Sequence, residues 1–313
     1  MLHVNERAME LCGKLADRAD LVNVERHSMH GATVWDFGVA ASGNLEAGIR
    51  LAELCTGGLA TIQIEPPVAD WHGPSVSVRT DHPIAACMAS QYAGWQLATD
   101  DYFAMGSGPM RAANGAEEIF EAIGNRETAT KVVGVLESNK MPTESCLQAI
   151  AESCRVSIPD ITLAIARTAS QAGNVQVVAR SVETALHKMH ELGFDLSRVE
   201  SGYGIAPLPP VAKDDLAGIG RTNDAILFGG SVTIWVRGDD ESLEAISPQL
   251  PSSASRDFGK PFREIFADYD HDFYKIDKHL FSPAKIMLCN LDTGNSFLSG
   301  EIYPDLIKKS FLA

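Results

Sequence analysis

The sequence predicts a fold that mixes helices and strands and is divided into two domains. With 313 residues, 45% of them hydrophobic, the chain can bury a full core and is long enough for two domains. Helical and strand patterns alternate along the whole chain. Parts of the first half also reappear in the second half at an offset of 172 residues. A repeat array or a disordered protein is therefore not expected.

The first half alternates helical patterns with short strands. Gly57 and Gly58 end a helix and precede a strand rich in β-branched residues, and Pro142 opens another helix. In order, we expect a helix over roughly 4–19, paired strands in 22–39, a helix and a strand in 41–68, a mostly buried helix in 82–98, a glycine-rich loop at 104–115, a helix at 116–124, a strand at 129–138, a helix at 143–154 and a strand at 161–168.

The second half opens on an amphipathic helix and ends on a hairpin whose DTGN turn suits a tight reversal. In order, we expect a helix at 177–194, an extended linker at 204–210, a helix at 214–227, a strand at 231–238, a loop at 251–262, the hairpin at 284–302 and a short helix from Pro304.

The internal repeat has the form G-G-x-x-T-I-x-[IV] after a helix. It aligns Val39, Ala40, Gly48, Gly57, Gly58, Thr61 and Ile62 with Val211, Ala212, Gly220, Gly229, Gly230, Thr233 and Ile234. A duplication favours a ligand pocket between the two halves, although chance recurrence of this punctuation is the alternative. We expect a discontinuous first domain of 1–100 and 270–313 and a second domain of 101–269.

Charge and composition exclude several classes of protein. A net charge of −15 argues against a phosphate-neutralising surface and so against nucleic-acid binding. No apolar run approaches the roughly 20 residues of a membrane span, and the charged N-terminus does not resemble a signal peptide, so we expect a cytoplasmic protein. The six cysteines, without a C-x-x-C, are expected to be buried thiols.

The segment 177–194 places Arg180 and Glu183 opposite its apolar sector. At 100° per residue, the apolar side chains share one sector, while Arg180, Glu183, His187 and Glu191 lie on the other side. One interpretation is a solvated ion pair worth a few tenths of a kcal/mol. The other is that this polar face lines a cleft, where the arginine holds a carboxylate ready for proton transfer. Periodicity alone favours the ion pair.

Two other kinds of catalytic site have weak support. Glu183, His187 and His190 include metal-ligand types, but the outer two lie about 10 Å apart along a straight helix, against ligand bonds near 2 Å. Ser107 in MGSGPM is not a G-x-S-x-G nucleophile, and no phosphate-binding or dinucleotide motif is present. This loop could offer backbone N–H groups to an anion beside Arg111, although a tight turn explains it equally well. Gln91 has the simple interpretation of satisfying a buried backbone group.

Seven short stretches of sequence are distributed over essentially the whole chain. They are VNERAMEL at the start, DFGV with AGIRLAELCTGGLA, ASQYAGW at 89–95, GSGPMRA at 106–112, VLES at 135–138, ARSVETALHKMHELGFD in the middle, and FSPAKIMLCNLDTGNSFLSGEI at the end. Their combination, in order and at compatible spacing, is more specific than any one motif, and it resembles the methenyltetrahydromethanopterin cyclohydrolase family.

The resemblance implies an α+β fold of two α/β-layered domains enclosing a pocket, and a homotrimer. It implies reversible hydrolysis of the cationic methenyl bridge of N5,N10-methenyl-tetrahydromethanopterin to the N5-formyl compound in one-carbon metabolism. No cofactor or metal is expected, since tetrahydromethanopterin is the substrate carrier. The family's catalytic arginine and glutamate, three apart on a helix, match Arg180 and Glu183. Arg111, Ser107, Gly108 and Gln91 are our candidates for substrate binding.

The chemistry fits these residue types. The substrate carbon is already an amidinium-like electrophile, so the reaction needs a base for water and an acid for the departing nitrogen, and one carboxyl group can serve as both in turn. Burial would raise the pKa of Glu183 and Arg180 would lower it. A metal-dependent amidohydrolase using His187 or His190 and a noncatalytic pterin-binding protein stay open as alternatives.

Overall fold

A computed structural model describes residues 2–270 and 272–312. The chain forms two compact units, and it passes from one to the other three times. Unit 1 comprises Met1–Ala60 and Ile84–Gln176, and unit 2 comprises Thr61–Pro83 and Val177–Ala313. Each unit holds one six-stranded sheet that combines parallel and antiparallel pairs. The predicted α+β class is confirmed.

The units differ from the predicted domains 1–100 with 270–313 and 101–269. Strand β11 (Lys285–Asn290) pairs with β10 (Ser231–Val236), which joins the C-terminal segment to residues that the prediction assigns to the other domain. Strand β2 (Ala32–Gly38) similarly pairs with β8 (Ile161–Ala166). Hydropathy patterns locate strands but carry little information about which distant strand becomes the neighbour.

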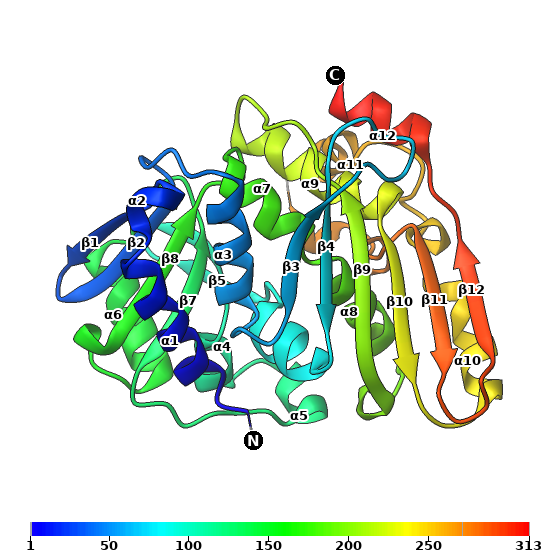
Figure 1. The fold of residues 1–313 in the computed structure, drawn as a ribbon, viewed down its shortest axis with the longest axis horizontal. Helices are drawn as coiled ribbons and strands as arrows, with labels where there is room; N and C mark the ends of the chain where they lie inside the picture. Colours follow the sequence, from blue (N-terminus) through cyan, green and yellow to red (C-terminus); the bar gives the residue numbers. More distant parts are fainter. Residues whose placement is uncertain (1, 271, 313) are drawn as a thin grey trace. The chain divides into compact units, whose positions relative to one another are not determined.

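Unit 1 is a sheet of order β1-β2-β8-β7-β6-β5 with helices on both faces (Figure 1). Its elements are α1 (Val4–Ala16), α2 (Ala19–Val22), β1 (Glu25–Met29), β2, α3 (Leu45–Cys55), a π-helix (Ile84–Gln91), β5 (Trp95–Ala98), β6 (Phe103–Ser107), α4 (Met110–Asn114), α5 (Ile119–Ile123), β7 (Val132–Glu137), α6 (Glu144–Cys154), a 3₁₀ turn (Ile158–Asp160), β8 and α7 (Gln171–Val178), which runs into unit 2.

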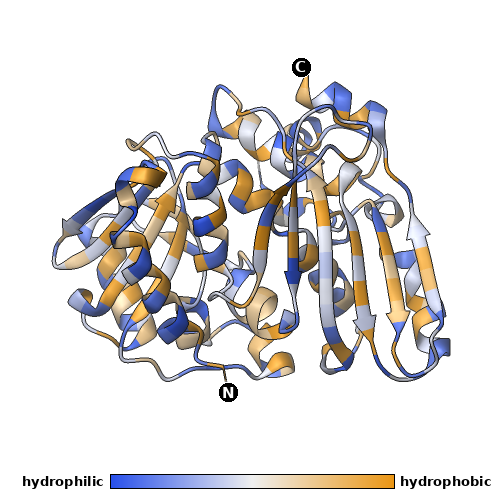
Figure 2. Cartoon of the chain, in the orientation of Figure 1, coloured by the Kyte–Doolittle hydropathy of each residue, from blue (hydrophilic) through white to orange (hydrophobic). Residues whose placement is uncertain are grey.

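The central strands of unit 1, β7 and β8, are mostly apolar (Figure 2). Alternate side chains point to opposite faces of a strand. Accordingly, Leu163 and Ile165 of β8 pack into a core with α4 and α6, whereas Ala164 and Ala166 pack into a second core with α1 and α3. Strands buried on both faces read as continuous hydrophobic runs, and this sheet shows that pattern.

Unit 2 is a sheet of order β12-β11-β10-β9-β4-β3. Its elements are β3 (Thr61–Glu65), β4 (Ser75–Thr80), α8 (Ser181–Glu191), β9 (Val199–Pro207), α9 (Asp215–Gly229), β10, α10 (Asp240–Ile246), α11 (Phe262–Asp268), β11, β12 (Ser296–Gly300) and α12 (Pro304–Phe311), with 3₁₀ turns at Leu196–Arg198, Ser247–Gln249, Ser252–Ala254, Phe273–Lys275 and Lys278–Leu280. The predicted C-terminal hairpin is confirmed. The predicted linker 204–210 is wrong at its start, because β9 continues to Pro207 between β4 and β10.

The internal repeat in the sequence does not correspond to two copies of one local structure. Gly57 and Gly58 adopt left-handed backbone angles, with φ of +61° and +67°. In the second half, Gly229 is the last residue of α9 and Gly230 has a φ of −71°. The strands that follow, β3 and β10, lie in the same sheet of unit 2. The structure therefore does not confirm a duplication, and the pocket that the sequence predicts stays a prediction.

Helix α8 packs on one face of the unit 2 sheet, against β4, β9 and β10 (Figure 1). Strand β9 carries glycine at the two positions beneath the start of this helix. A Cβ atom at Gly202 would lie 2.7 Å from a methyl group of Val182, and one at Gly204 would lie 2.4 Å from the hydroxyl oxygen of Ser181. The helix can rest this close to the sheet only because both side chains are absent.

Helices α11 and α12 are tied to α9 through one buried carboxyl group. Asp224 is fully buried and accepts hydrogen bonds from the backbone N–H of Phe262 at 2.8 Å and from the hydroxyl of Ser310 at 2.6 Å. Burial raises the pKa of Asp224 to about 7, since two neutral donors only partly replace water. This carboxyl group therefore stays protonated in the folded protein over a pH range in which the unfolded chain has lost the proton.

Replacing Gly202 with alanine tests the close approach of α8. The new methyl group must displace Val182, so we expect Gly202→Ala to lower the free energy of unfolding by roughly 1–3 kcal/mol. Thermal and urea unfolding measure this loss. The matched control is Gly13→Ala in α1, where an added Cβ meets nothing within 4 Å. Equal stability of Gly202→Ala and the control would contradict the packing argument.

The raised pKa of Asp224 predicts the pH dependence of stability. Because the folded protein binds this proton more tightly than the unfolded chain does, its contribution to stability declines as pH rises from about 4 to about 7 and is constant above that. Asp224→Asn keeps the shape without the titration. We expect the variant to gain stability relative to the wild type at pH 8 compared with pH 4, measured by urea unfolding at both pH values. A pH-independent difference would contradict this assignment.

Candidate active site

The start of α8 carries both predicted catalytic residues. The sequence predicts one helix over 177–194, but the structure ends α7 at Val178 and begins α8 at Ser181, with Arg180 as the N-cap. The carbonyl oxygen of Arg180 accepts the hydrogen bond of the Thr184 N–H at 2.9 Å. Glu183 lies in the first turn, where the partial positive charge of the helix N-terminus favours a carboxylate.

Both side chains are buried. Arg180 is 6% exposed and Glu183 is 5% exposed, so neither belongs to a solvated surface pair. Of the two interpretations that the sequence leaves open, the solvated ion pair is therefore wrong. Buried ionisable groups are costly unless other charges or hydrogen bonds compensate them, and they are characteristic of functional sites. The glycines of β9 hold this turn of α8 in place through Ser181 and Val182.

The remaining polar residues of α8 form contacts at its C-terminal half. The Nε2 atom of His187 lies 3.5 Å from a carboxylate oxygen of Glu191, which also contacts Lys278. Burial lowers the pKa of His187 to about 4, so its ring is neutral at physiological pH. Among residues 2–270 and 272–312, no three His, Cys, Asp or Glu side chains are grouped so that they could hold a metal ion.

Lys188 is a buried ionisable residue that the sequence does not identify as a candidate. Its side chain is 1% exposed, and its ammonium group donates to the carbonyl oxygen of His279 at 2.6 Å. Burial lowers the pKa of Lys188 to about 8, with the charge of Asp277 acting in the opposite direction. Helical periodicity could have identified it, because position 188 lies beside Ser181 and Ala185 on the packed side of the helix.

The four predicted substrate-binding residues all lie in unit 1, where the loop GSGPMR meets the π-helix. Here β6 ends at Ser107 and α4 begins at Met110. The N–H of Gly108 donates to the carbonyl oxygen of Ser90 at 2.8 Å, and the hydroxyl of Ser107 lies 3.3 Å from the sulfur of Cys55. Gln91 is fully buried at the end of the π-helix. The backbone of this loop is thus engaged within unit 1.

Arg111 has no exposed surface and is held by partners inside unit 1. Its Nε and Nη2 atoms donate to the two carboxylate oxygens of Glu117 at 2.7 and 2.8 Å, and Nη1 donates to the carbonyl oxygen of Met88 at 2.8 Å. The guanidinium also lies over the rings of Tyr92 and Phe120, 4.8 and 5.5 Å from their centroids. A planar bidentate pair of this kind fixes its surroundings firmly.

The π-helix is the feature that the sequence analysis misses in this region. The sequence predicts a helix over 82–98, but the structure has π-turns from Ile84 to Gln91 and then strand β5. The N–H of Tyr92 bonds to the carbonyl oxygen of Cys87 at 2.7 Å, the i to i+5 spacing of a π-turn. Hydropathy does not distinguish a π-turn from an α-turn, so the sequence does not predict the π-helix. In the structure, the π-turns mark this segment as a candidate functional segment, because π-turns occur frequently at functional sites.

Two cavities lie away from these residues. The one in unit 2, about 390 Å³, is polar and is lined by Arg256, Asp257, Phe258, Gly259, Lys260, Ile265, Asp268 and Tyr269. A smaller one in unit 1, about 120 Å³, lies between α1, α2 and α3.

In the part of the chain that the structure describes, no helix is both long enough and apolar enough to cross a bilayer. Five of the six predicted buried thiols are confirmed, whereas Cys289 is half-buried.

Comparison with known proteins covers nearly the whole chain. The model of a family described as Cyclohydrolase (MCH) matches residues 3–311. Relatives named methenyltetrahydromethanopterin cyclohydrolase include a protein of Rhodopirellula baltica, 48% identical over 90% of this chain and 86% of its own. One of Methylobacillus flagellatus is 43% identical over 98% and 95%, and one of Methanococcoides burtonii is 42% identical over 99% and 98%. This chain is a member of the methenyltetrahydromethanopterin cyclohydrolase family.

Proposed function

We propose that this protein hydrolyses the methenyl bridge of N5,N10-methenyl-tetrahydromethanopterin to N5-formyl-tetrahydromethanopterin, reversibly, as a step of one-carbon metabolism. The observation that carries the proposal is the burial of Glu183 and Arg180 at the start of α8, in a chain that its relatives match over almost its full length. A carboxyl group shielded from bulk water beside a helix N-terminus is suited to exchanging a proton with a bound substrate.

The proposed reaction needs one group that accepts and then returns a proton. Water adds to the cationic methenyl carbon, and Glu183 takes a proton from it as the C–O bond forms. The same carboxyl group gives this proton to N10 as the C–N10 bond breaks. The proton of the new hydroxyl leaves as the formyl C=O forms, so one proton is released per turnover. Arg180 would favour the ionised form of Glu183, and the carboxylate would attract the cationic substrate.

The predicted substrate-binding group of unit 1 keeps this role as a proposal. Arg111 already uses three of its nitrogen atoms on Glu117 and Met88, so we propose that it acts by fixing the π-helix that ends at Gln91. Ser107 and Gly108 adjoin the same segment through Cys55 and Ser90. The absence of a cofactor and of a metal also stays a prediction, as does the cytoplasmic location.

We propose that the protein is a homotrimer and that its subunits meet through one face of the unit 2 sheet. One face of the unit 2 sheet carries Tyr203, Trp235, Met287 and Leu298 in adjacent strands, and Leu298 is 59% exposed. The solvent-facing side of a sheet is usually polar, and contiguous apolar surface marks interaction sites. The same face carries Arg79 and Lys285, whose positive charges suit a contact between copies that each carry a net charge of −15.

Glu183→Gln tests the proposed chemistry, because glutamine keeps the size but cannot exchange a proton. We expect turnover to fall by about 100- to 10,000-fold with little change in KM. The decay of the methenyl absorbance measures it. Glu191→Gln, on the same helix and paired with Lys278, is the matched control and should stay active. Near-normal turnover of Glu183→Gln would remove Glu183 from the mechanism.

The same assay decides between the proposed function and the two alternatives. Binding of the methenyl compound without loss of its absorbance by the wild-type protein would indicate a noncatalytic pterin-binding protein. Activity that disappears on exhaustive chelation and returns with metal would indicate a metal-dependent amidohydrolase. We expect turnover that chelation leaves unchanged, and a clear preference for the tetrahydromethanopterin derivative over the tetrahydrofolate one.

Leu298→Glu tests the proposed trimer surface. Three charges brought together on an apolar contact repel one another and must be desolvated, so we expect light scattering to show the wild type as a trimer and the variant as a monomer. Leu21→Glu, at a 72% exposed position of α2 in unit 1, is the control and should leave the mass unchanged. A variant that keeps the trimer mass would exclude this face as the contact.

A further inference from the structure

Lys188 is a buried charge in a helix that has no structural need of one. It lies on the same helix as Glu183 and is more deeply buried, at 1% exposure against 5%. A methionine of similar length would fill the same volume without the cost of removing an ammonium group from water. Replacing a buried charge by an apolar side chain of similar volume is often neutral or stabilising. The presence of a lysine here therefore requires an explanation other than packing.

The ammonium group of Lys188 meets a backbone carbonyl from a distant part of unit 2. Its Nζ atom donates to the carbonyl oxygen of His279 at 2.6 Å, across 91 residues of sequence. With a pKa of about 8, the lysine is mostly protonated at neutral pH, so the bond is charge-assisted and short. Asp277 and His279 lie on the segment that supplies this carbonyl. His187 and Glu191 are the titratable groups nearby on the helix itself.

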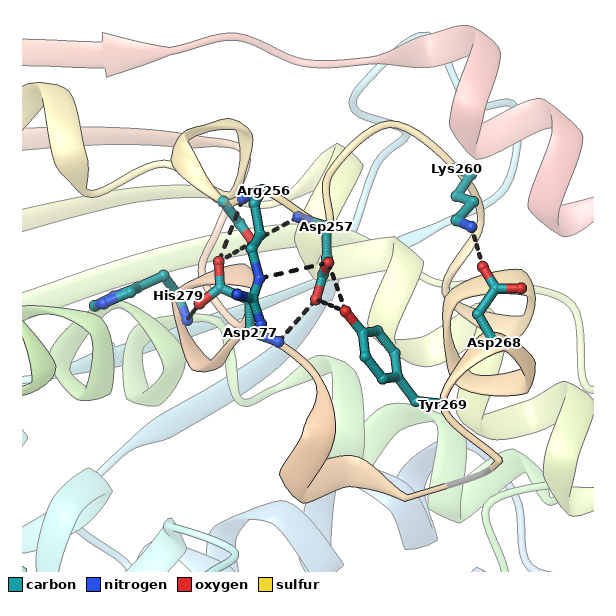
Figure 3. Close-up of polar contacts among 8 residues, drawn as sticks. Arg256, Asp257, Lys260, Asp268, Tyr269, Asp277 and His279 are labelled. Atoms are coloured by element: carbon teal, nitrogen blue, oxygen red, sulfur yellow. Dashed lines mark hydrogen bonds and ion pairs between the residues drawn. The ribbon is translucent and has the colours of Figure 1, made fainter.

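The carbonyl that Lys188 contacts belongs to a segment fixed by two carboxylates, as Figure 3 shows. Asp277 accepts from the N–H of His279 at 3.1 Å and from the hydroxyl of Ser255 at 2.7 Å. Asp257 accepts from the N–H of Asp277 at 2.8 Å and from the hydroxyl of Tyr269 at 2.9 Å. These bonds give the His279 carbonyl a fixed position, which a flexible loop would not provide.

Helix α8 is thus fastened on both sides of Glu183. On the N-terminal side, Val182 rests on Gly202 of the sheet, and on the C-terminal side Lys188 reaches the His279 carbonyl. The first contact sets the height of the helix above the sheet, but apolar contact is non-directional and supplies no bond of defined geometry. The second contact is directional, because a hydrogen bond weakens steeply when its geometry is lost.

We propose that Lys188 is a positioning residue for the reaction: its bond to the His279 carbonyl fixes the rotation of α8 and so aims the carboxyl group of Glu183. The inference rests on the proposed function, because it assigns Lys188 a role through Glu183. Lys188 itself touches neither substrate nor water in this scheme. A rotated helix would present the carboxyl group at the wrong angle, which slows proton transfer while leaving binding of the substrate intact.

The test compares Lys188→Met, Lys188→Arg and the control Lys278→Met in the full-length protein, by steady-state kinetics on the methenyl compound and by thermal unfolding. We expect Lys188→Met to stay folded, to lose about 10- to 100-fold in kcat and to keep KM within about twofold. Lys188→Arg, which can still donate to the carbonyl, should regain part of the loss. Lys278→Met removes a lysine that is 61% exposed at its side chain on the same segment, and should stay fully active.

A Lys188→Met variant with wild-type kcat would overturn the inference and leave the lysine a structural residue. If that variant does not fold, Asp277→Asn decides instead, since it loosens the His279 carbonyl from the other side: a loss of kcat at unchanged KM supports the inference, and an unchanged kcat overturns it. Glu183→Gln is assayed beside them. An active Glu183→Gln overturns both proposals, whereas an inactive one together with a fully active Lys188→Met overturns only the role of Lys188.

Discussion

The close approach of α8 to β9 is the constraint on which the candidate active site depends. Gly202 and Gly204 leave no side chain beneath Ser181 and Val182, so the first turn of the helix lies almost on the backbone of the sheet. Steric contact fixes the distance between the two elements more rigidly than any surface pair could. Arg180 is the N-cap and Glu183 a first-turn residue of that helix, and both side chains are buried.

Buried polar groups perform the same task elsewhere in the molecule, and most of them bind backbone. Asp36 accepts hydrogen bonds from four consecutive backbone N–H groups of residues 38–41. Asn5 donates to the carbonyl oxygen of Pro109 at 2.9 Å and accepts from the N–H of Val133 at 3.0 Å. Arg111 and Lys188 each capture a carbonyl oxygen. A fully satisfied buried polar group fixes loop geometry, because its alternative conformations would leave it without partners.

Much of the local structure could be predicted from the sequence, whereas the pairing of distant elements could not. Patterns identify the helix that begins near Glu144, strands β1, β2, β7 and β8 of unit 1 and the C-terminal hairpin, because periodicity and turn residues are local signals. They miss β5, which lies in the predicted helix 82–98, and β6, most of which lies in the predicted loop 104–115. The end of strand β9 lies in GIAPLPP, a stretch that the sequence predicts as a linker because of its glycine and prolines; only its pairing with β4 and β10 identifies it as a strand. The limits of the domains could not be predicted for the same reason, because they depend on which strands pair with one another.

The candidate site shows the same division. The sequence shows the types and the spacing of Arg180 and Glu183. Helical periodicity places them on the side that faces solvent, and only the fold shows that they are buried. Lys188 appears in the sequence as one more charge on an amphipathic helix. Its significance comes from a carbonyl 91 residues away, which no local pattern contains. The sequence suggests Arg111 as a partner for an anion, whereas in the structure its guanidinium donates to Glu117 and to the carbonyl oxygen of Met88.

The three passages of the chain between the units have a consequence for its synthesis on the ribosome. Strand β4 ends at Thr80, but its neighbour β9 begins only at Val199, so the β3–β4 hairpin emerges long before the rest of its sheet. Strand β2 likewise waits for β8. During this interval the nascent chain carries unpaired strand edges, the surfaces on which polypeptides aggregate. The edge of β4 that pairs with β9 is therefore covered only after residues 199–207 have been synthesised.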